Sequence, residues 1–447
     1  MKSKLITIIL VLIFSSNSFA QLYSLRDNQA MLNGGFGITW IDGQPYYGFH
    51  LRPEFVFSKV GVGIDLKLEY GADGKIRTEN FNEFSDYLSI IRYIRYGLKG
   101  DPLYARLGAL DYATLGHGSI MYLYNNSPSY DTRKIGVELD IDFNTFGIES
   151  VYSVFGEAGV FGLRGYTRPL QFTELRTVPI IGNLELGASI VTDLHNKSGV
   201  LTGSYDEIEN KFTAVQDEGA VTIVGIDLGL PILRTAMVNL DLYFDFNKIL
   251  KFGSGAATGF IFNLKGLGIV DLRTRFERRI NGDEYLPSYF NSFYELERFQ
   301  LDRGTGMFSS KVQALKNAGP AGNGWYGELL ISVLGTLDIL GSYQRLDKDP
   351  KSGMLHLSTN VMPESMPYVF RAGYDKVNIQ DEKDLFKLDD RSYLFAEFGY
   401  RPVPYLILSL VYHWTFTPVR DADKNIIDYE PQKRLEPRVS FIYPLSF

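Results

Sequence analysis

The sequence predicts an all-β protein, a single closed antiparallel transmembrane β-barrel of about 18–20 strands. Two observations predict this fold. Apolar and polar residues alternate in one segment after another, which gives each strand one apolar face. The connections between these segments are alternately short and long, as expected for short periplasmic turns and longer outer loops. We therefore interpret the 447 residues as one barrel rather than as several soluble domains.

The last strand, residues 437–447, shows the alternation clearly. Val439, Phe441 and Tyr443 share one face, and the chain ends on Phe447. This stretch resembles the C-terminal insertion signal of Gram-negative outer-membrane β-barrels, and the chain is similar in size to porins of that class. The resemblance implies a place in the cell outer membrane, contact with outer-membrane lipid and insertion by the barrel-assembly machinery.

Residues 1–20 are predicted to be a secretory signal peptide, which leaves residues 21–447 for the transmembrane β-barrel. Lys2 and Lys4 precede a short apolar run, and Ala20 ends a small-residue cleavage site. The 29 Tyr, 31 Phe and 44 Gly suit aromatic girdles and tight turns. The absence of cysteine excludes disulfides and thiolate metal sites. The net charge of −7 disfavours nucleic acid as a partner.

Alternation predicts strands along the whole chain. They are residues 32–40, 47–57, 60–70, 88–96, 103–110, 134–143, 184–194, 221–230, 236–246, 256–264, 268–278, 325–334, 336–343, 354–359, 368–374, 393–400, 405–414 and the last strand, with a weaker hairpin at 147–155 and 159–167. The strand count is 20 if that hairpin spans the membrane and 18 if it does not, and both numbers are even, as bacterial barrels require.

Counting back from the last strand assigns each connection to one end of the barrel. The connections predicted to lie outside are 71–86, 111–133, 195–218, 247–255, 280–324, 346–352, 377–390 and 417–434. Connection 168–183 falls inside and is longer than a periplasmic turn should be.

Charged side chains on the strands are predicted to face the lumen, because an Arg or Lys on the lipid face would cost about 2–4 kcal/mol near the midplane. These candidate binding residues are Arg52, Glu54, Arg106, Glu138, Asp140, Asp241, Asp271, Arg273, Arg275, Glu277, Arg371 and Glu397. Their mixed signs could create a transverse field across a water-filled pore. They could also form the salt-bridged polar core of a closed barrel. The width of such a barrel favours the pore.

Connection 280–324 combines aromatic and basic residues and could set the width of the lumen. Its candidate constriction residues are Tyr289, Phe290, Tyr294, Arg298 and Arg303. Folded inward it would narrow the passage, and folded outward it would form a surface lid. We give these two outcomes equal weight.

The glycine-rich stretch Gly116-His117-Gly118-Ser119 brings a histidine and a serine close in sequence. A His–Ser hydrolase needs a hydrogen bond between them and an orienting group behind the histidine. We favour a loop that needs positive φ angles instead. The sequence shows no metal-ligand spacing, so we expect no catalytic residue, no metal and no cofactor.

The expected function is therefore the passage of small solutes through a charged lumen, as in a porin-like channel or transporter. Two alternatives stay open. The barrel could be an outer-membrane enzyme that hydrolyses lipid or peptide, or a structural barrel that presents its loops and has a plugged lumen.

Overall fold

The structure, a computed structural model, describes residues 31–77, 87, 90–129, 133–266, 269–319, 323–334, 336–361, 366–422 and 426–444. The predicted signal peptide and the terminal Phe447 lie outside these residues. No helix in the described part of the chain is long and apolar enough to cross a membrane.

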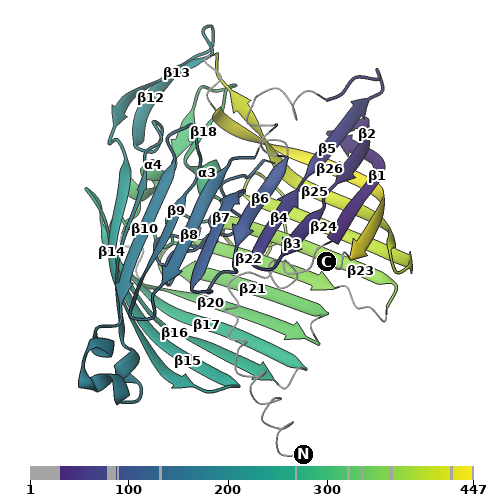
Figure 1. Cartoon of the computed structure of the whole chain (residues 1–447). Helices are drawn as coiled ribbons and strands as arrows, with labels where there is room; N and C mark the ends of the chain where they lie inside the picture. Colours follow the sequence, from purple (N-terminus) through teal and green to yellow (C-terminus); the bar gives the residue numbers. More distant parts are fainter. Residues whose placement is uncertain are drawn as a thin grey trace, which may run out of the picture.

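The wall of the molecule is one large antiparallel sheet (Figure 1). Its strands are β1 (Met31–Ile41), β2 (Gln44–Leu51), β3 (Glu54–Phe57), β4 (Val60–Ile64), β5 (Leu66–Gly71), β6 (Ile91–Tyr96), β7 (Leu103–Gly108), β8 (Gly136–Asp142), β9 (Phe146–Tyr152), β10 (Val160–Thr167), β11 (Glu185–Asp193), β14 (Val221–Arg234), β15 (Val238–Ile249), β16 (Ser254–Gly266), β17 (Val270–Asn281), β20 (Asn323–Val333), β21 (Leu337–Leu346), β22 (Gly353–Val361), β23 (Tyr368–Ile379), β24 (Ser392–Val403), β25 (Leu406–Arg420) and β26 (Ile426–Pro444).

The sheet closes on itself, because β1 pairs with β26 along most of its length, with Phe36 opposite Val439. The described part of the sheet has 22 strands. Four of these strands span the wall only twice. β2 and β3 together form one interrupted strand, and β4 and β5 form the next. The two interrupted strands pair with each other, β2 with β5 and β3 with β4. In the described residues the barrel therefore has 20 wall-spanning strands, which confirms the larger predicted count, and β9 and β10 confirm the weaker hairpin.

The two faces of each strand differ in chemistry. In β15 the outward residues Leu242, Phe244 and Phe246 are exposed, whereas Tyr243 and Asp245 between them are buried. This alternation gives the barrel an apolar outer belt and a polar interior. A closed barrel with an even strand number and such a belt is the architecture of the bacterial outer membrane, and the protein belongs there.

The periplasmic connection between β10 and β11 is long, as its sequence indicated. It forms three short 3-10 helices: η3 (Pro169–Phe172), η4 (Glu174–Thr177) and η5 (Ile181–Asn183). Pro169 begins the first of them, where its missing N–H is not needed.

Two predicted outer loops are instead β structure. Residues 195–218 contain a hairpin of β12 (Val200–Asp206) and β13 (Lys211–Asp217), which projects beyond the wall (Figure 1). Residues 417–434 continue β25 and β26, with Thr417 opposite Glu430. Both predictions of a loop were wrong because polar residues beyond the apolar belt can still satisfy their backbone groups in a ladder.

The connection between β17 and β20 has structure of its own. It contains α3 (Tyr294–Glu297), β18 (Phe299–Leu301), β19 (Phe308–Ser310) and α4 (Lys311–Lys316). Ser310 begins α4 with a capping box, in which its hydroxyl accepts from the N–H of Gln313. We call the described part of this connection, residues 282–319, the lumen segment.

Candidate functional site: the lumen segment and the outer cleft

The lumen segment folds into the barrel. Tyr289, Phe290 and Tyr294 are buried and belong to one apolar cluster with wall residues. The wall residues come from the outer ends of β9, β10, β11, β14 and β15 and are Val151, Val160, Val191, Val221, Ile223 and Ile249. Of the two equally weighted predictions for connection 280–324, the inward one is therefore correct.

The connection between β7 and β8, which we call the β7–β8 loop, also turns inward. The N–H of Tyr122 donates to the carbonyl of Phe290 at 3.0 Å, and the N–H of Phe290 donates to the carbonyl of Ile120 at 3.1 Å, which makes a parallel bridge between Met121 and Phe290. Leu115, Ile120 and Met121 join the same apolar cluster. Connection 111–133 lies at the predicted outer end of the barrel, but it folds into the lumen, because its apolar side chains pack against the lumen segment.

The apolar cluster should hold the lumen segment in place. Phe290→Ala should destabilise the docked segment by about 3–5 kcal/mol, because it removes a fully buried ring. Limited proteolysis of the refolded protein would show this as faster cleavage within the segment. Phe172→Ala is the matched control, since Phe172 is 67% exposed. Equal cleavage of the two variants would contradict the packing argument.

An ion cluster joins the lumen segment to the wall. Arg298 Nε donates to Asp193 Oδ2 at 2.6 Å, and its two terminal nitrogens donate to Glu295 at 2.9 and 2.7 Å. Lys134 and Tyr124 also donate to Glu295, each at 2.6 Å. We call Asp193, Glu295 and Arg298 the anchor cluster.

Charge in the anchor cluster depends on mutual pairing. Burial alone would raise the pKa of Glu295, but the charges of Arg298 and Lys134 and the hydrogen bonds lower this pKa to about 2. The pKa of His195 nearby is lowered to about 3 by burial and by the charges of the same Arg298 and Lys134. Around neutral pH, Glu295 in the cluster is therefore ionised, and His195 beside the cluster is neutral.

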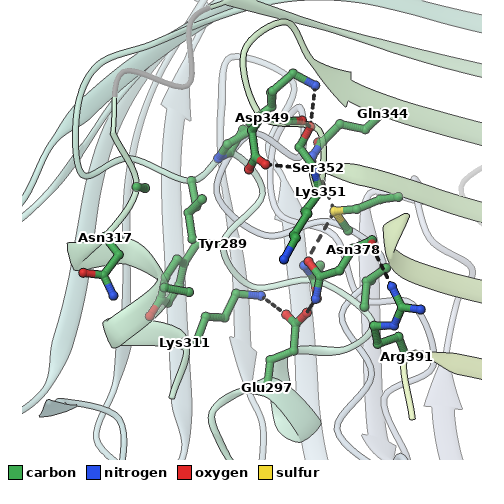
Figure 2. Close-up of a pocket in the computed structure, with 18 of the residues that line it drawn as sticks. Tyr289, Glu297, Lys311, Asn317, Gln344, Asp349, Lys351, Ser352, Asn378 and Arg391 are labelled. Atoms are coloured by element: carbon green, nitrogen blue, oxygen red, sulfur yellow. Dashed lines mark hydrogen bonds and ion pairs between the residues drawn. The ribbon is translucent and has the colours of Figure 1, made fainter. Parts of the chain in front are cut away.

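A cleft of about 800 Å³ opens beside the lumen segment. Figure 2 shows Tyr289, Glu297 and Lys311 of the segment on one side, with Asn378 of β23 and Arg391 of the β23–β24 connection facing them. Lys311 Nζ lies 2.6 Å from Glu297 Oε2, and Arg391 donates to the carbonyl of Asn378 at 2.8 Å. We call this space the outer cleft.

The outer cleft has a distinctive lining. Its charged side chains are Glu297, Asp349, Lys311, Lys348, Lys351 and Arg391, so cations outnumber anions four to two. Its carboxamides are Asn291, Gln300, Asn317, Gln344, Asn378 and Gln380. Carboxamides both donate and accept hydrogen bonds, so the cleft suits polar solutes.

Eleven of the predicted lumen residues lie on strands of the wall, and Arg52 lies in the short break between β2 and β3. Five of them are buried: Arg106, Glu138, Arg275, Glu277 and Glu397. The half-buried ones are Arg52, Glu54, Asp140, Asp241, Asp271, Arg273 and Arg371. Their role in solute selection stays a prediction.

Most of these charges are paired. The ion-pair partners are Asp65 for Arg52, Arg92 for Glu54, Asp111 for Arg106, Lys99 for Glu138 and Asp140, Arg234 for Asp241, Glu277 for Arg275, and Glu397 for Arg371. Arg275 is also enclosed by the rings of Tyr122, Tyr243 and Tyr326 at 5.2–5.3 Å. Most of the charges are paired, and the lumen segment and the β7–β8 loop cover the inner wall. This arrangement supports the salt-bridged polar core over the pore predicted from barrel width.

Four of the five constriction candidates are buried, and Arg303 is the one that is not. Its side chain is 46% exposed and lies 3.5 Å from Glu430 of β26. The prediction that it lines a constriction is therefore corrected: the turn after β18 carries it to the outer surface.

Sequence reasoning missed several residues of the interior. Arg164 binds Glu149, Glu185 and Asp227 at 2.7–2.8 Å. Alternation within β10 could have placed Arg164 inside, since Leu163 next to it is exposed. The predicted positive φ angles are confirmed at Gly116 (+56°) and Gly118 (+86°).

No protein-family model matches the chain, and no curated protein matches it. Similar solved structures include OccK11 (OpdR) of Pseudomonas aeruginosa, 10% identical over 94% of this chain and 96% of that chain, with a TM-score of 0.30. Another is Wzi of Escherichia coli, a carbohydrate-binding outer-membrane barrel of group 1 capsule assembly, 10% identical over 98% and 92%, with a TM-score of 0.37. The siderophore receptor PiuA of Acinetobacter baumannii is 9% identical over 93% and 82%, at 0.32. The barrel assignment does not depend on these likenesses, because it follows from the chain's own strand pairing.

Proposed function

We propose that the protein is a gated outer-membrane channel that admits small polar solutes, with a preference for negatively charged ones. One observation carries the proposal: the lumen segment packs against the inner wall of the barrel and also forms one side of the outer cleft. A solute in the cleft touches the same segment that closes the lumen. The proposed role is non-catalytic.

Because the lumen segment takes part in both, solute binding in the cleft and opening of the lumen are coupled. A solute that binds the cleft more tightly when the lumen segment is displaced shifts the population toward the open barrel. Glu297 and Lys311 belong to the lumen segment and line the cleft, so a charged solute competes for their ion pair. The excess of lysine and arginine in the cleft supports a solute with a carboxylate or similar anionic group.

The preference for anions can be tested with matched probes. Lys348→Glu combined with Lys351→Glu should lower the flux of gluconate relative to glucose at least about fivefold, since one charge pair at 4 Å contributes about 1 kcal/mol even in water. Liposomes that contain the refolded protein report both fluxes. Lys383→Glu with Lys387→Glu is the control, because neither residue lines the cleft. An unchanged gluconate-to-glucose ratio in the cleft variant would contradict the proposal.

A second candidate is a barrel that presents its outer elements to a partner. The β12–β13 hairpin favours it, because Ile208 at its tip is 98% exposed and Val215 on its flank is 77% exposed. This candidate predicts no flux of either probe, even in a variant whose lumen segment has been released.

A further inference from the structure

One histidine of the β7–β8 loop meets two carboxylates of the wall. His117 Nδ1 lies 2.8 Å from Asp245 Oδ1 of β15, and Asp227 of β14 lies beside them. A ligand atom from each of the three residues lies within 4.8 Å of the other two. The imidazole ring stacks on Tyr243, with ring centroids 4.6 Å apart, so its orientation is fixed.

One oxygen of this group is buried without a hydrogen-bond partner. Asp245 is 1% exposed, and its Oδ2 accepts no hydrogen bond from any described residue. His117, Asp227 and Asp245 line a cavity of about 10 Å³. This is about the space that one water molecule or one small ion needs. An ionised oxygen buried in this way is costly unless a cation satisfies it.

The surrounding charges are also unbalanced. The carboxylates joined through contacts to this group are Asp142, Glu149, Glu185, Asp227 and Asp245, and the guanidiniums among them are Arg164 and Arg168. Five carboxylates thus face two guanidiniums and one imidazole, so negative charge remains even if His117 is protonated. A divalent cation would offset this excess.

We propose that His117, Asp227 and Asp245 bind a divalent transition-metal ion of the Zn²⁺ class. One imidazole nitrogen and two carboxylate oxygens form the donor set of many zinc sites, whereas Mg²⁺ and Ca²⁺ prefer oxygen alone. Arg164 donates to both oxygens of Asp227, at 3.0 and 2.7 Å. Because a carboxylate has about four lone-pair sites, this contact orients Asp227 and leaves it able to bind the ion.

The ion would tie the β7–β8 loop to the wall. His117 brings the loop to Asp227 of β14 and Asp245 of β15, and it stands between two glycines with positive φ angles. The site is independent of the outer cleft, whose lining contains none of the three ligands.

Calorimetry with Zn²⁺ alone tests the site on the mature chain, refolded in detergent and stripped with EDTA. We expect one Zn²⁺ per chain and no comparable binding of Ca²⁺. His117→Gln and Asp245→Asn should each weaken Zn²⁺ binding at least tenfold. His356→Gln is the matched control: His356 is a buried histidine with its Nδ1 2.7 Å from Asp375 Oδ1, so this variant should bind as the wild type does.

A second measurement uses only the wild-type protein, so its result does not depend on whether the variants fold. Co²⁺ in place of Zn²⁺ should give the intense visible absorption of a four-coordinate site, and added Zn²⁺ should abolish it. The proposal is overturned if the wild type binds neither ion, if Co²⁺ keeps the weak spectrum of the aqueous ion, or if His117→Gln and His356→Gln lose equal affinity.

Discussion

Arg298→Ala should convert a mostly closed barrel into a conducting one. In the wild type, Arg298 donates to Asp193 and Glu295, and all three side chains are buried. Its removal leaves two buried carboxylates without their shared cation, which typically costs about 3–5 kcal/mol. The open fraction should therefore rise roughly 100-fold or more. Single-channel recording in a planar bilayer measures this fraction directly.

The chain supplies a close control for this experiment. Arg303 lies five positions further along the same lumen segment, but its side chain is 46% exposed and pairs with Glu430 at the surface. An exposed pair of this kind contributes at most about 1 kcal/mol, so Arg303→Ala should conduct as the wild type does. If Arg298→Ala also conducts as the wild type does, the lumen segment is not the gate, and presentation of the outer elements becomes the better explanation.

The wall was predictable from the sequence because one physical rule governs it. Each strand must bury its polar face and expose an apolar face to lipid, so Leu242, Phe244 and Phe246 identify their strand without any knowledge of its neighbours. The same rule placed Glu397 inside, although it shares a face with Tyr393 and Phe395. Closure by β1 and β26 follows once every strand is assigned.

The interior was not predictable in the same way. Tyr289 belongs to an apolar cluster whose other members lie far away in sequence, such as Val191 and Ile249, and no periodicity encodes this packing. The meeting of His117 with Asp227 and Asp245 is likewise set by the path of a loop and the register of two strands. Inward charge alone therefore could not predict which of these residues are paired and covered.

Acid should open the barrel through the anchor cluster. The pKa of Glu295 is about 2 in the docked segment, against an ordinary value of 4.5. A carboxyl whose pKa is lowered by docking stabilises the docked state above pH 4.5, and this stabilisation is lost as the pH falls toward 2. The difference corresponds to about 3 kcal/mol.

His195 acts in the same direction at a higher pH. Burial and the charges of Arg298 and Lys134 lower its pKa from 6.5 to about 3 in the docked state. The undocked histidine therefore binds a proton more readily, and docking weakens as the pH falls from 6.5 toward 3. Conductance should thus rise in two stages between pH 7 and pH 2, and it should return to its first value when neutral pH is restored.

Two variants separate these stages. Glu295→Gln should conduct already at pH 7, because its amide cannot pair with Arg298 as a carboxylate does, and it should lose the stage below pH 4.5. His195→Gln should stay closed at pH 7 and lose the stage between pH 6.5 and 4.5. A wild-type conductance that does not change down to pH 2 would mean that the anchor cluster does not control the lumen. An acid response that Glu295→Gln retains in full would assign the control to other carboxylates of the wall.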